Sequence, residues 1–174
     1  HNTSWGFLCP AETPEGGSVG VVKNLSYMTN VTIPANSNGI YDYVKPYIKD
    51  FEDMTTKELL ENVKVFVNGA WVGNTDNPIE LYNSLKTKKY KGIINIYAAI
   101  VFDIRKKEIR VINDAGRLTR PVLRVIDNKL VLNKTHIEKL KNKEMKWLDL
   151  LLDIFDENNT VIEYIDAFEQ NYSM

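Results

Sequence analysis

Short apolar segments separated by turn residues run through the middle of the chain, between residues 63 and 132. The clearest turn is Asn68-Gly69, which stands between two apolar triplets; this pair is favoured in type I′ turns, where both central residues need φ > 0. The same pattern joins 98–104 to 108–112 around Arg105-Lys106-Lys107, and joins 122–126 to 130–132 around residues 127–129. This part of the chain is therefore predicted to form β-hairpins.

Capping boxes predict two helices. Thr55 with Glu58 opens a helix over 56–62, because each side chain caps a backbone N–H of the other residue. Thr135 with Glu138 is predicted to open another helix in the same way. After these come a helix with one apolar face and a closing strand: Met145, Leu148, Leu152 and Phe155 for the face, and residues 161–165 for the strand.

The longest helix is predicted to begin after Asn77, a good N-cap, with Pro78 at its first position. Apolar residues then follow at helical spacing and form one buried face: Pro78, Leu81, Tyr82 and Leu85. The last turn carries Lys86, Lys88 and Lys89, where the helix dipole favours cations. Gly92 is expected to end the helix.

These elements together predict an α+β fold of short antiparallel hairpins with a few helices. Four segments are expected: 1–30, a turn with its flanks; 31–62, a loop and a short helix; 63–132, the hairpin-rich core; and 133–174, a helical pair with a closing strand.

Residues 9–17 form a turn restrained by its own backbone: Cys9-Pro10-Ala11-Glu12-Thr13-Pro14-Glu15-Gly16-Gly17. The prolines fix φ and the glycines allow tight bends, so the turn needs no helix or strand pairing to hold it. Apolar residues flank it on both sides and are expected to anchor it in a core: Phe7, Leu8, Val19, Val21, Val22 and Leu25. A stiff turn of this kind is suited to presenting side chains to a partner.

The chain has 174 residues, of which 44% are hydrophobic and 26% charged, as is usual for a globular domain. No apolar run approaches the roughly 20 residues of a bilayer span, so no membrane partner is expected. The formal net charge of −1 hides an uneven distribution: residues 86–124 hold eleven Lys/Arg against three Asp/Glu, and residues 144–174 hold eight acids against Lys146. The basic part favours a polyanion or an acidic partner, unless both parts are simply solvated faces.

Side chains for catalysis or metal binding are scarce. Cys9 is the only cysteine, and His1 and His136 are the only histidines that could serve it as a base, which leaves a cysteine hydrolase as the least favoured function. One cysteine with two distant histidines gives no zinc-ligand spacing. We therefore predict no catalytic residue, no metal ligand and no cofactor of the chain's own, and a lone cysteine fits an intracellular, reducing compartment.

Several motifs resemble one known family when they are taken in order. They are His1-Asn2-Thr3-Ser4-Trp5-Gly6, the turn 9–17, Val21-Val22-Lys23-Asn24-Leu25, residues 66–73, residues 103–110, Asp114-Ala115-Gly116-Arg117 with Arg120-Pro121, and Glu163-Tyr164-Ile165-Asp166-Ala167. This succession resembles the second-largest, β-like subunit of multisubunit DNA-directed RNA polymerases, in its archaeal, eukaryotic and large-DNA-virus form. The resemblance implies a fragment of a larger subunit: the end of the fork region over 1–30, followed by the external 2 domain.

The resemblance also implies site residues. The turn would border the active-centre cleft beside nascent RNA and the RNA–DNA hybrid, and the residues expected to face the cleft are Glu12, Pro14, Glu15 and Ser18. Lys23, Arg117 and Arg120 are expected to contact nucleic acid or a neighbouring subunit. For the two arginines, an internal salt bridge that pins the turn is the open alternative.

The implied parent enzyme makes RNA on a DNA template and uses Mg²⁺ that is held outside this segment, so the isolated fragment is expected to be inactive. Its implied partners are the largest polymerase subunit, other polymerase subunits, template DNA and nascent RNA. The implied compartment is the nucleus, a cytoplasmic viral factory or a virion.

Alternatives remain open at three points. A stand-alone protein-interaction module is the competing function. Trp71 and Trp147 suit a core, with base stacking as the alternative. The basic segments 86–91 and 105–107 either face solvent or steer DNA.

Overall fold

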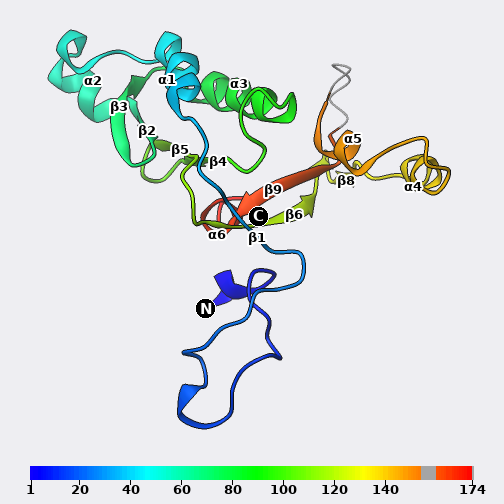
Figure 1. Ribbon diagram of the computed structural model, residues 1–174. Helices are drawn as coiled ribbons and strands as arrows, with labels where there is room; N and C mark the ends of the chain where they lie inside the picture. The colour runs from blue at the N-terminus through cyan, green and yellow to red at the C-terminus, as the bar shows by residue number, and fades with distance from the viewer. Residues whose placement is uncertain (154–159, 174) are drawn as a thin grey trace.

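The computed structural model describes residues 1–153 and 160–173 as a mixed helix and strand structure, which confirms the α+β prediction (Figure 1). Its α-helices are α1 Asn38–Val44, α2 Thr56–Glu61, α3 Pro78–Tyr90, α4 Lys134–Lys141, α5 Trp147–Leu151 and α6 Ala167–Gln170. Its strands are β1 Asn30–Val31, β2 Val63–Val67, β3 Ala70–Thr75, β4 Ala99–Asp103, β5 Glu108–Ile112, β6 Leu118–Leu123, β7 Val125–Ile126, β8 Lys129–Leu130 and β9 Ile162–Asp166.

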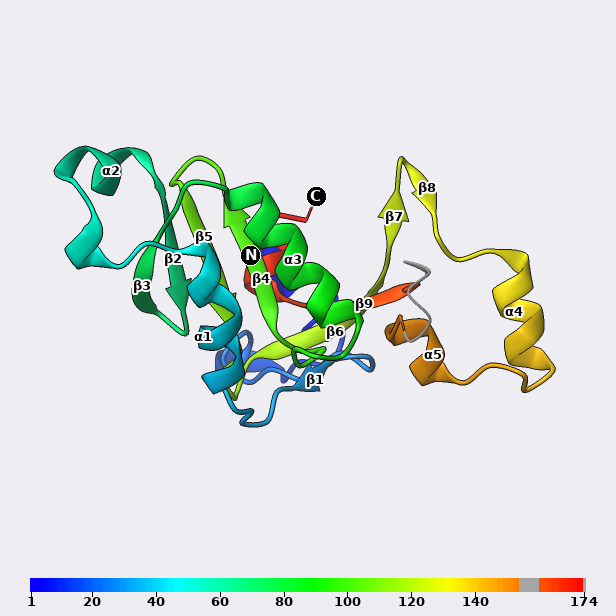
Figure 2. The ribbon, with the colours of Figure 1, turned by 90° about the horizontal axis from the view of Figure 1, so that it is seen from above.

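A four-stranded sheet in the order β3-β2-β5-β4 forms the centre of the largest lobe. The β2–β3 and β4–β5 pairs are antiparallel hairpins, while β2 and β5 run parallel and join the two. Helices α1 and α3 cover one face of this sheet (Figures 1 and 2). The hydrophobic core between them contains Ile40, Val44, Val65, Val67, Leu81, Leu85, Ile94, Ala98, Ile100, Ile109 and Val111.

A second sheet, in the order β1-β6-β9, ties distant parts of the chain together. Strand β1 pairs with β6 through Asn30 and Val31, so the N-terminal segment is bonded to the middle of the chain. Strand β9 pairs with the other edge of β6. Pro121 lies in β6 beyond the two residues that β1 reaches, where its missing N–H leaves no ladder position empty.

The hairpin β7–β8 and helices α4 and α5 extend to one side as an arm (Figure 2). A small apolar core of Leu150, Leu151, Val161 and Ile162 attaches this arm to β9. Helix α4 lies at the far end and has no buried residue. The arm therefore packs against the rest of the chain mainly where α5 meets β9.

The local turn predictions are confirmed. Asn68 and Gly69 have φ of 48° and 84°, and Asp127 and Asn128 have φ of 48° and 59°, as type I′ hairpin turns require. The capping box of Thr55 and Glu58 forms both of its bonds and opens α2. The predicted hairpin 122–126/130–132 is shorter than expected, because Val122 and Leu123 pair with β9 instead.

Several helix predictions were wrong in detail. Helix α3 begins at Pro78 after Asn77, as predicted, but the Asn77 side chain makes no capping bond. The box for α4 is built by Asn133 and His136 rather than by Thr135 and Glu138, since the Asn133 carboxamide already accepts the bond from the His136 N–H at 3.0 Å. Helix α5 spans only five residues and ends before Leu152, and Phe155 lies outside the described residues.

Two burial predictions also fail. Of the apolar residues that flank the N-terminal turn, Phe7 is buried, but Val19, Val21, Val22 and Leu25 are about half exposed or more. Trp147, expected in a core, is 47% exposed at the start of α5. Apolar composition alone does not reveal which apolar side chains find a partner within the same chain.

Candidate functional site

The N-terminal turn forms the tip of a long loop that projects away from both sheets (Figure 1). The loop closes at its base through a bridge between Leu8 and Leu25 and through a bond from the Cys9 N–H to the Asn24 carbonyl at 2.9 Å. Asn24 reaches across with its amide and donates to the Glu12 carbonyl at 3.1 Å. The two limbs of the loop are therefore joined by backbone bonds and one side-chain bond near its base.

The residues that we expect to face a cleft all lie in this loop. Glu12, Glu15 and Ser18 are exposed, and Pro14 is half-buried. A 3-10 turn over Gly16–Ser18 follows, with Gly16 at φ 79°, a conformation that favours glycine. Lys23, on the returning limb, is also exposed and donates only a long bond to the Val21 carbonyl at 3.4 Å.

A tight joint holds the root of the loop on the second sheet. Phe7 is 1% exposed, and the Arg120 guanidinium lies 5.6 Å from the centre of its ring. Gly6 has φ 83°, and a Cβ there would lie 2.8 Å from the Arg120 side chain. Thr29 donates to the Phe7 carbonyl at 2.9 Å, and Arg120 donates to Gln170 at 2.8 Å. The loop therefore leaves a rigid base in a defined direction.

Arg117 is held by groups of this chain. Its guanidinium pairs with Asp166 at 2.9 Å and with Asp114 at 2.9 Å, and it donates to the Tyr97 carbonyl at 3.0 Å. Its side chain is only 14% exposed. Arg117 thus forms an internal ion pair and pins the turn after β5 to the end of β9, while its contact with nucleic acid or a neighbouring subunit stays a prediction. Arg120, in its contacts with Phe7 and Gln170, likewise has a packing role.

The sequence pattern missed a buried ionic cluster. Lys86 and Lys89, expected on a solvent-facing basic segment, are buried beneath Glu163 of β9 and Glu169 of α6. Lys86 contacts one carboxylate oxygen of each glutamate at 2.5 Å, and Lys89 contacts Glu163 at 3.0 Å. The expectation that the basic segment 86–91 faces solvent is therefore wrong for Lys86 and Lys89, which join α3 to the second sheet.

Burial and charge act against each other in this cluster. Burial opposes the ionisation of Glu163, but Lys89 and Lys86 together outweigh burial and lower its pKa to about 2. Burial dominates for Glu169 and raises its pKa, and the neighbouring Glu163 charge adds to that effect. Burial also opposes the charge on Lys86, yet the two carboxylates raise its pKa. As the pH rises, Glu163 therefore loses its proton before Glu169 does, and Lys86 keeps its charge beside them.

Cys9, His1 and His136, the side chains considered for catalysis, each have partners close in sequence. Cys9 is half-buried, and its sulfur accepts the Glu12 N–H at 3.4 Å. His1 bonds to Thr3, and His136 is occupied in the cap of α4, on the remote arm. Residues 1–153 and 160–173 contain no group of three or more His, Cys, Asp and Glu that could hold a metal ion. Within the same ranges, no helix is long and apolar enough to cross a membrane.

Two models of one protein family match the chain. The model described as RNA polymerase Rpb2, domain 3, matches residues 1–31, which form the projecting loop and β1. The model described as RNA polymerase Rpb2, domain 4, matches residues 65–126, which form most of the four-stranded sheet, α3 and β6.

Curated relatives are similar to the chain along its whole length. DNA-directed RNA polymerase II subunit RPB2 of Encephalitozoon cuniculi is 43% identical over 175 residues, which cover 100% of this chain and 15% of the relative. The subunit of the same name from Meyerozyma guilliermondii is 35% identical and is matched over 100% of this chain and 16% of its own length. DNA-directed RNA polymerase subunit 2 of Acanthamoeba polyphaga mimivirus is 36% identical over 100% of this chain and 14% of its own length. The chain thus spans about one-seventh of each of these relatives.

Proposed function

Because the chain belongs to the family of the second-largest subunits of DNA-directed RNA polymerases, we propose that it forms part of the wall of a transcription cleft. The projecting loop is the part that would line this cleft, with Glu12, Pro14, Glu15 and Ser18 turned toward the RNA–DNA hybrid. The single observation that supports this role is an exposed loop that projects from a base packed around Phe7 and Arg120.

Exposed apolar residues in the loop and in the segment that follows it support the proposal that other polypeptide covers this region. Tyr27 is 100% exposed, and Val21 and Ile33 are each 73% exposed. Apolar side chains gathered on one segment mark contact surfaces. We propose that other parts of the parent subunit and the largest polymerase subunit cover them, which leaves the polar tip at the cleft. The four-segment division 1–30, 31–62, 63–132 and 133–174 belongs to the same proposal.

The proposed activity of the parent is template-directed RNA synthesis, inside the cell wherever its template DNA is transcribed. Mg²⁺ belongs to that proposal for the assembled enzyme. The described residues of this chain do not form a site for it, so no chemical step is assigned to them. The role of this segment is to shape and bound the cleft, and the isolated chain is expected to make no RNA.

The carboxylate of Glu15 gives the sharpest test. A negative charge beside the hybrid repels phosphate and limits how tightly the hybrid is held, so Glu15→Ala in the full enzyme should change the pausing and elongation rate. Glu138, an exposed carboxylate on the remote α4, provides the matched control. Unchanged elongation, pausing and initiation in Glu15→Ala would contradict the proposed role of the loop.

A stand-alone interaction module is the other function considered, and the family match over the whole chain does not favour it.

A further inference from the structure

One face of the four-stranded sheet carries a row of aromatic and cationic side chains. Residues that pair directly across a sheet point to the same face, and Trp71 of β3 pairs with Phe66 of β2, which pairs with Arg110 of β5. Their neighbours Val65, Val67, Ile109 and Val111 point to the opposite face, into the core beneath α1 and α3. The row therefore lies on the face that α1 and α3 do not cover.

A β-bulge puts Trp71 into this row. The register shifts between Val65, which pairs with Gly73, and Phe66, which pairs with Trp71, so Val72 is the extra residue. Val72 packs against the apolar core, and Gly73 has φ 159° with no room for a Cβ, which would lie 2.6 Å from the Lys49 carbonyl. The bulge thus turns the indole away from the core and toward Phe66.

The rings and cations of the row are in contact. The Phe66 and Trp71 rings are stacked at 27° with centroids 6.2 Å apart, and Phe51 meets Trp71 edge-on at 4.9 Å. The Arg110 guanidinium lies 5.4 Å from the Phe66 centroid, and Lys64 lies 5.0 Å from the Trp71 centroid. Lys64, Phe66, Trp71 and Arg110 are each half-buried, and Phe51 is 44% exposed.

The far end of this face is closed. Phe168 of α6 lies against Arg110, at 5.7 Å from its guanidinium, and Val101 of β4 is buried there. A hollow of about 160 Å³ opens beside the row, between Phe66, Gly69, Arg110, Val111 and Ile112. The uncovered part is therefore the β5-β2-β3 part of the face, with a recess at one side of the aromatic row.

Positive charge borders the row at one end. Lys64 pairs with Glu108 across the sheet, and its N–H donates to the carbonyl of Lys107, so the exposed turn Arg105-Lys106-Lys107 adjoins the Lys64 end of the row. The two acids of β4 and β5 on this side, Asp103 and Glu108, are both engaged. Glu108 pairs with Arg110 at 2.6 Å, and Asp103 accepts the N–H groups of Arg105 and Lys106. Lys64 and the exposed turn 105–107 are therefore the cationic groups at this end of the row.

From this arrangement we propose that the uncovered face binds single-stranded nucleic acid, with bases stacked along Trp71 and Phe66 and phosphates at Lys64 and the turn 105–107. Aromatic platforms beside cationic side chains bind single strands with little sequence preference, because every base has a ring face to stack. A duplex keeps its bases paired and stacked and offers no ring face to the row. This site is separate from the projecting loop, and its presence in a transcribing enzyme rests on the proposed function.

The test uses the assembled polymerase, stalled on a transcription scaffold so that its cleft is already filled. A fluorescent decauridylate that contains 4-thiouridine is added, its Kd is measured by anisotropy, and its cross-links are mapped. We expect cross-links within 64–71 and 105–110. We also expect Phe66→Leu and Trp71→Ala each to weaken binding by about 5- to 150-fold, as the loss of one stacked base implies.

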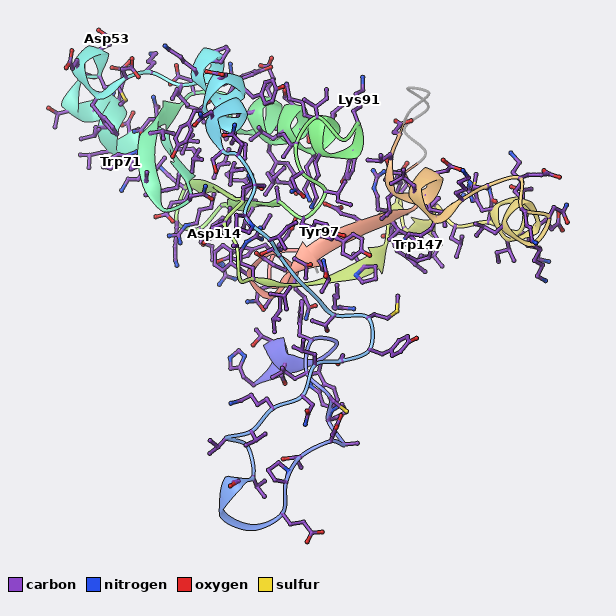
Figure 3. All side chains as sticks on the ribbon, viewed as in Figure 1. Asp53, Trp71, Lys91, Tyr97, Asp114 and Trp147 are labelled. Atoms are coloured by element: carbon purple, nitrogen blue, oxygen red, sulfur yellow. The ribbon has the colours of Figure 1, made fainter. Side chains whose placement is uncertain are left out.

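Controls separate binding from folding. Trp71 also donates to the Gly73 carbonyl and to Asn74, so Trp71→Phe, which keeps a stacking ring, should retain most of the affinity. The exposed double variant Lys106→Gln/Lys107→Gln leaves the row intact and should reduce the salt dependence of binding. Trp147→Ala, on the arm at the opposite end of the molecule from Trp71, should change nothing (Figure 3).

Two results would overturn the proposal: no cross-link to this face, or equal affinity for a matched duplex. An unchanged Kd in both Phe66→Leu and the double lysine variant would do the same, whether or not Trp71→Ala folds. Cross-links from the transcript to residues 10–18 test the proposed cleft wall, and cross-links from the decauridylate test the aromatic row. Either proposal can therefore fail without the other.

Discussion

Replacing Lys86 with methionine removes the centre of the buried ionic cluster while keeping most of the side-chain volume. Lys86 is 11% exposed and contacts Glu163 and Glu169 at 2.5 Å each. Without it, Glu163 keeps Lys89 at 3.0 Å, but Glu169 keeps only a 3.7 Å contact with that lysine. Two buried carboxylates would then share one cation.

The expected loss of stability comes from the buried carboxylates that remain after Lys86 is removed. Removing one partner of a buried pair costs about 3–5 kcal/mol, because the other partner is left as an uncompensated buried charge. Glu169 already has a raised pKa, so it can take up a proton and avoid part of this loss. We therefore expect Lys86→Met to lower the free energy of unfolding by about 3 kcal/mol at pH 7, and the added change Glu169→Gln to restore a part of it.

The assay is urea unfolding of the chain at pH 7, followed by circular dichroism. Lys57→Met is the matched control, since Lys57 is 79% exposed and its pair with Glu61 spans 4.0 Å; its effect should be within about 0.5 kcal/mol. A loss below about 1 kcal/mol for Lys86→Met, or no recovery in the double variant, would refute the reasoning that the cluster is one coupled unit.

Three further changes test other parts of the structure. Thr55→Ala removes one bond of the capping box and should cost about 1 kcal/mol, seen as faster hydrogen exchange over 56–61; unchanged exchange would contradict the role of the cap. Asn68→Ala loses the bonds to Ser37 and to the Asn113 N–H and places alanine at φ 48°, so the thermal midpoint should fall, and Asn68→Gly should fall less. The lowered pKa of Glu163 contributes stability that is complete above its ordinary value of 4.5 and is lost as the pH falls toward about 2. Acid unfolding should therefore become less steep in Glu163→Gln, and an identical pH profile would refute the assignment.

Local turn chemistry explains why the hairpins could be predicted. Asn68-Gly69 needs only its own φ values to reverse the chain, and the contacts that follow are between neighbours in sequence. The parallel pairing of β2 with β5 could not be predicted in this way, because it joins segments more than forty residues apart with a helix between them. The bulge at Val72 was missed for the same reason, since it is visible only once the register is known.

At the candidate site too, features set by local sequence could be predicted, and features set by distant contacts could not. The two prolines of the 9–17 turn restrict its backbone and could be recognised from the sequence. The exposure of Val19 and Val21 could not, because a sequence pattern does not show whether the partner surface belongs to the same chain. From the sequence, Lys86 and Lys89 look like a cationic helix end. Their shared partner Glu163 lies 77 and 74 residues further along the chain, so the pairing could not be predicted. These lysines can be buried only because the fold brings a carboxylate from a distant part of the chain against them.

The claim that the projecting loop lines a transcription cleft can be tested most directly by cross-linking from the growing end of the transcript. Elongation complexes of the parent enzyme would be stalled with a photoreactive nucleotide in the RNA strand of the hybrid, irradiated, and digested for mass spectrometry. The account predicts adducts on residues 10–18. The account would be contradicted if adducts formed only on other parts of the enzyme and added protease cleaved this loop in the same complexes.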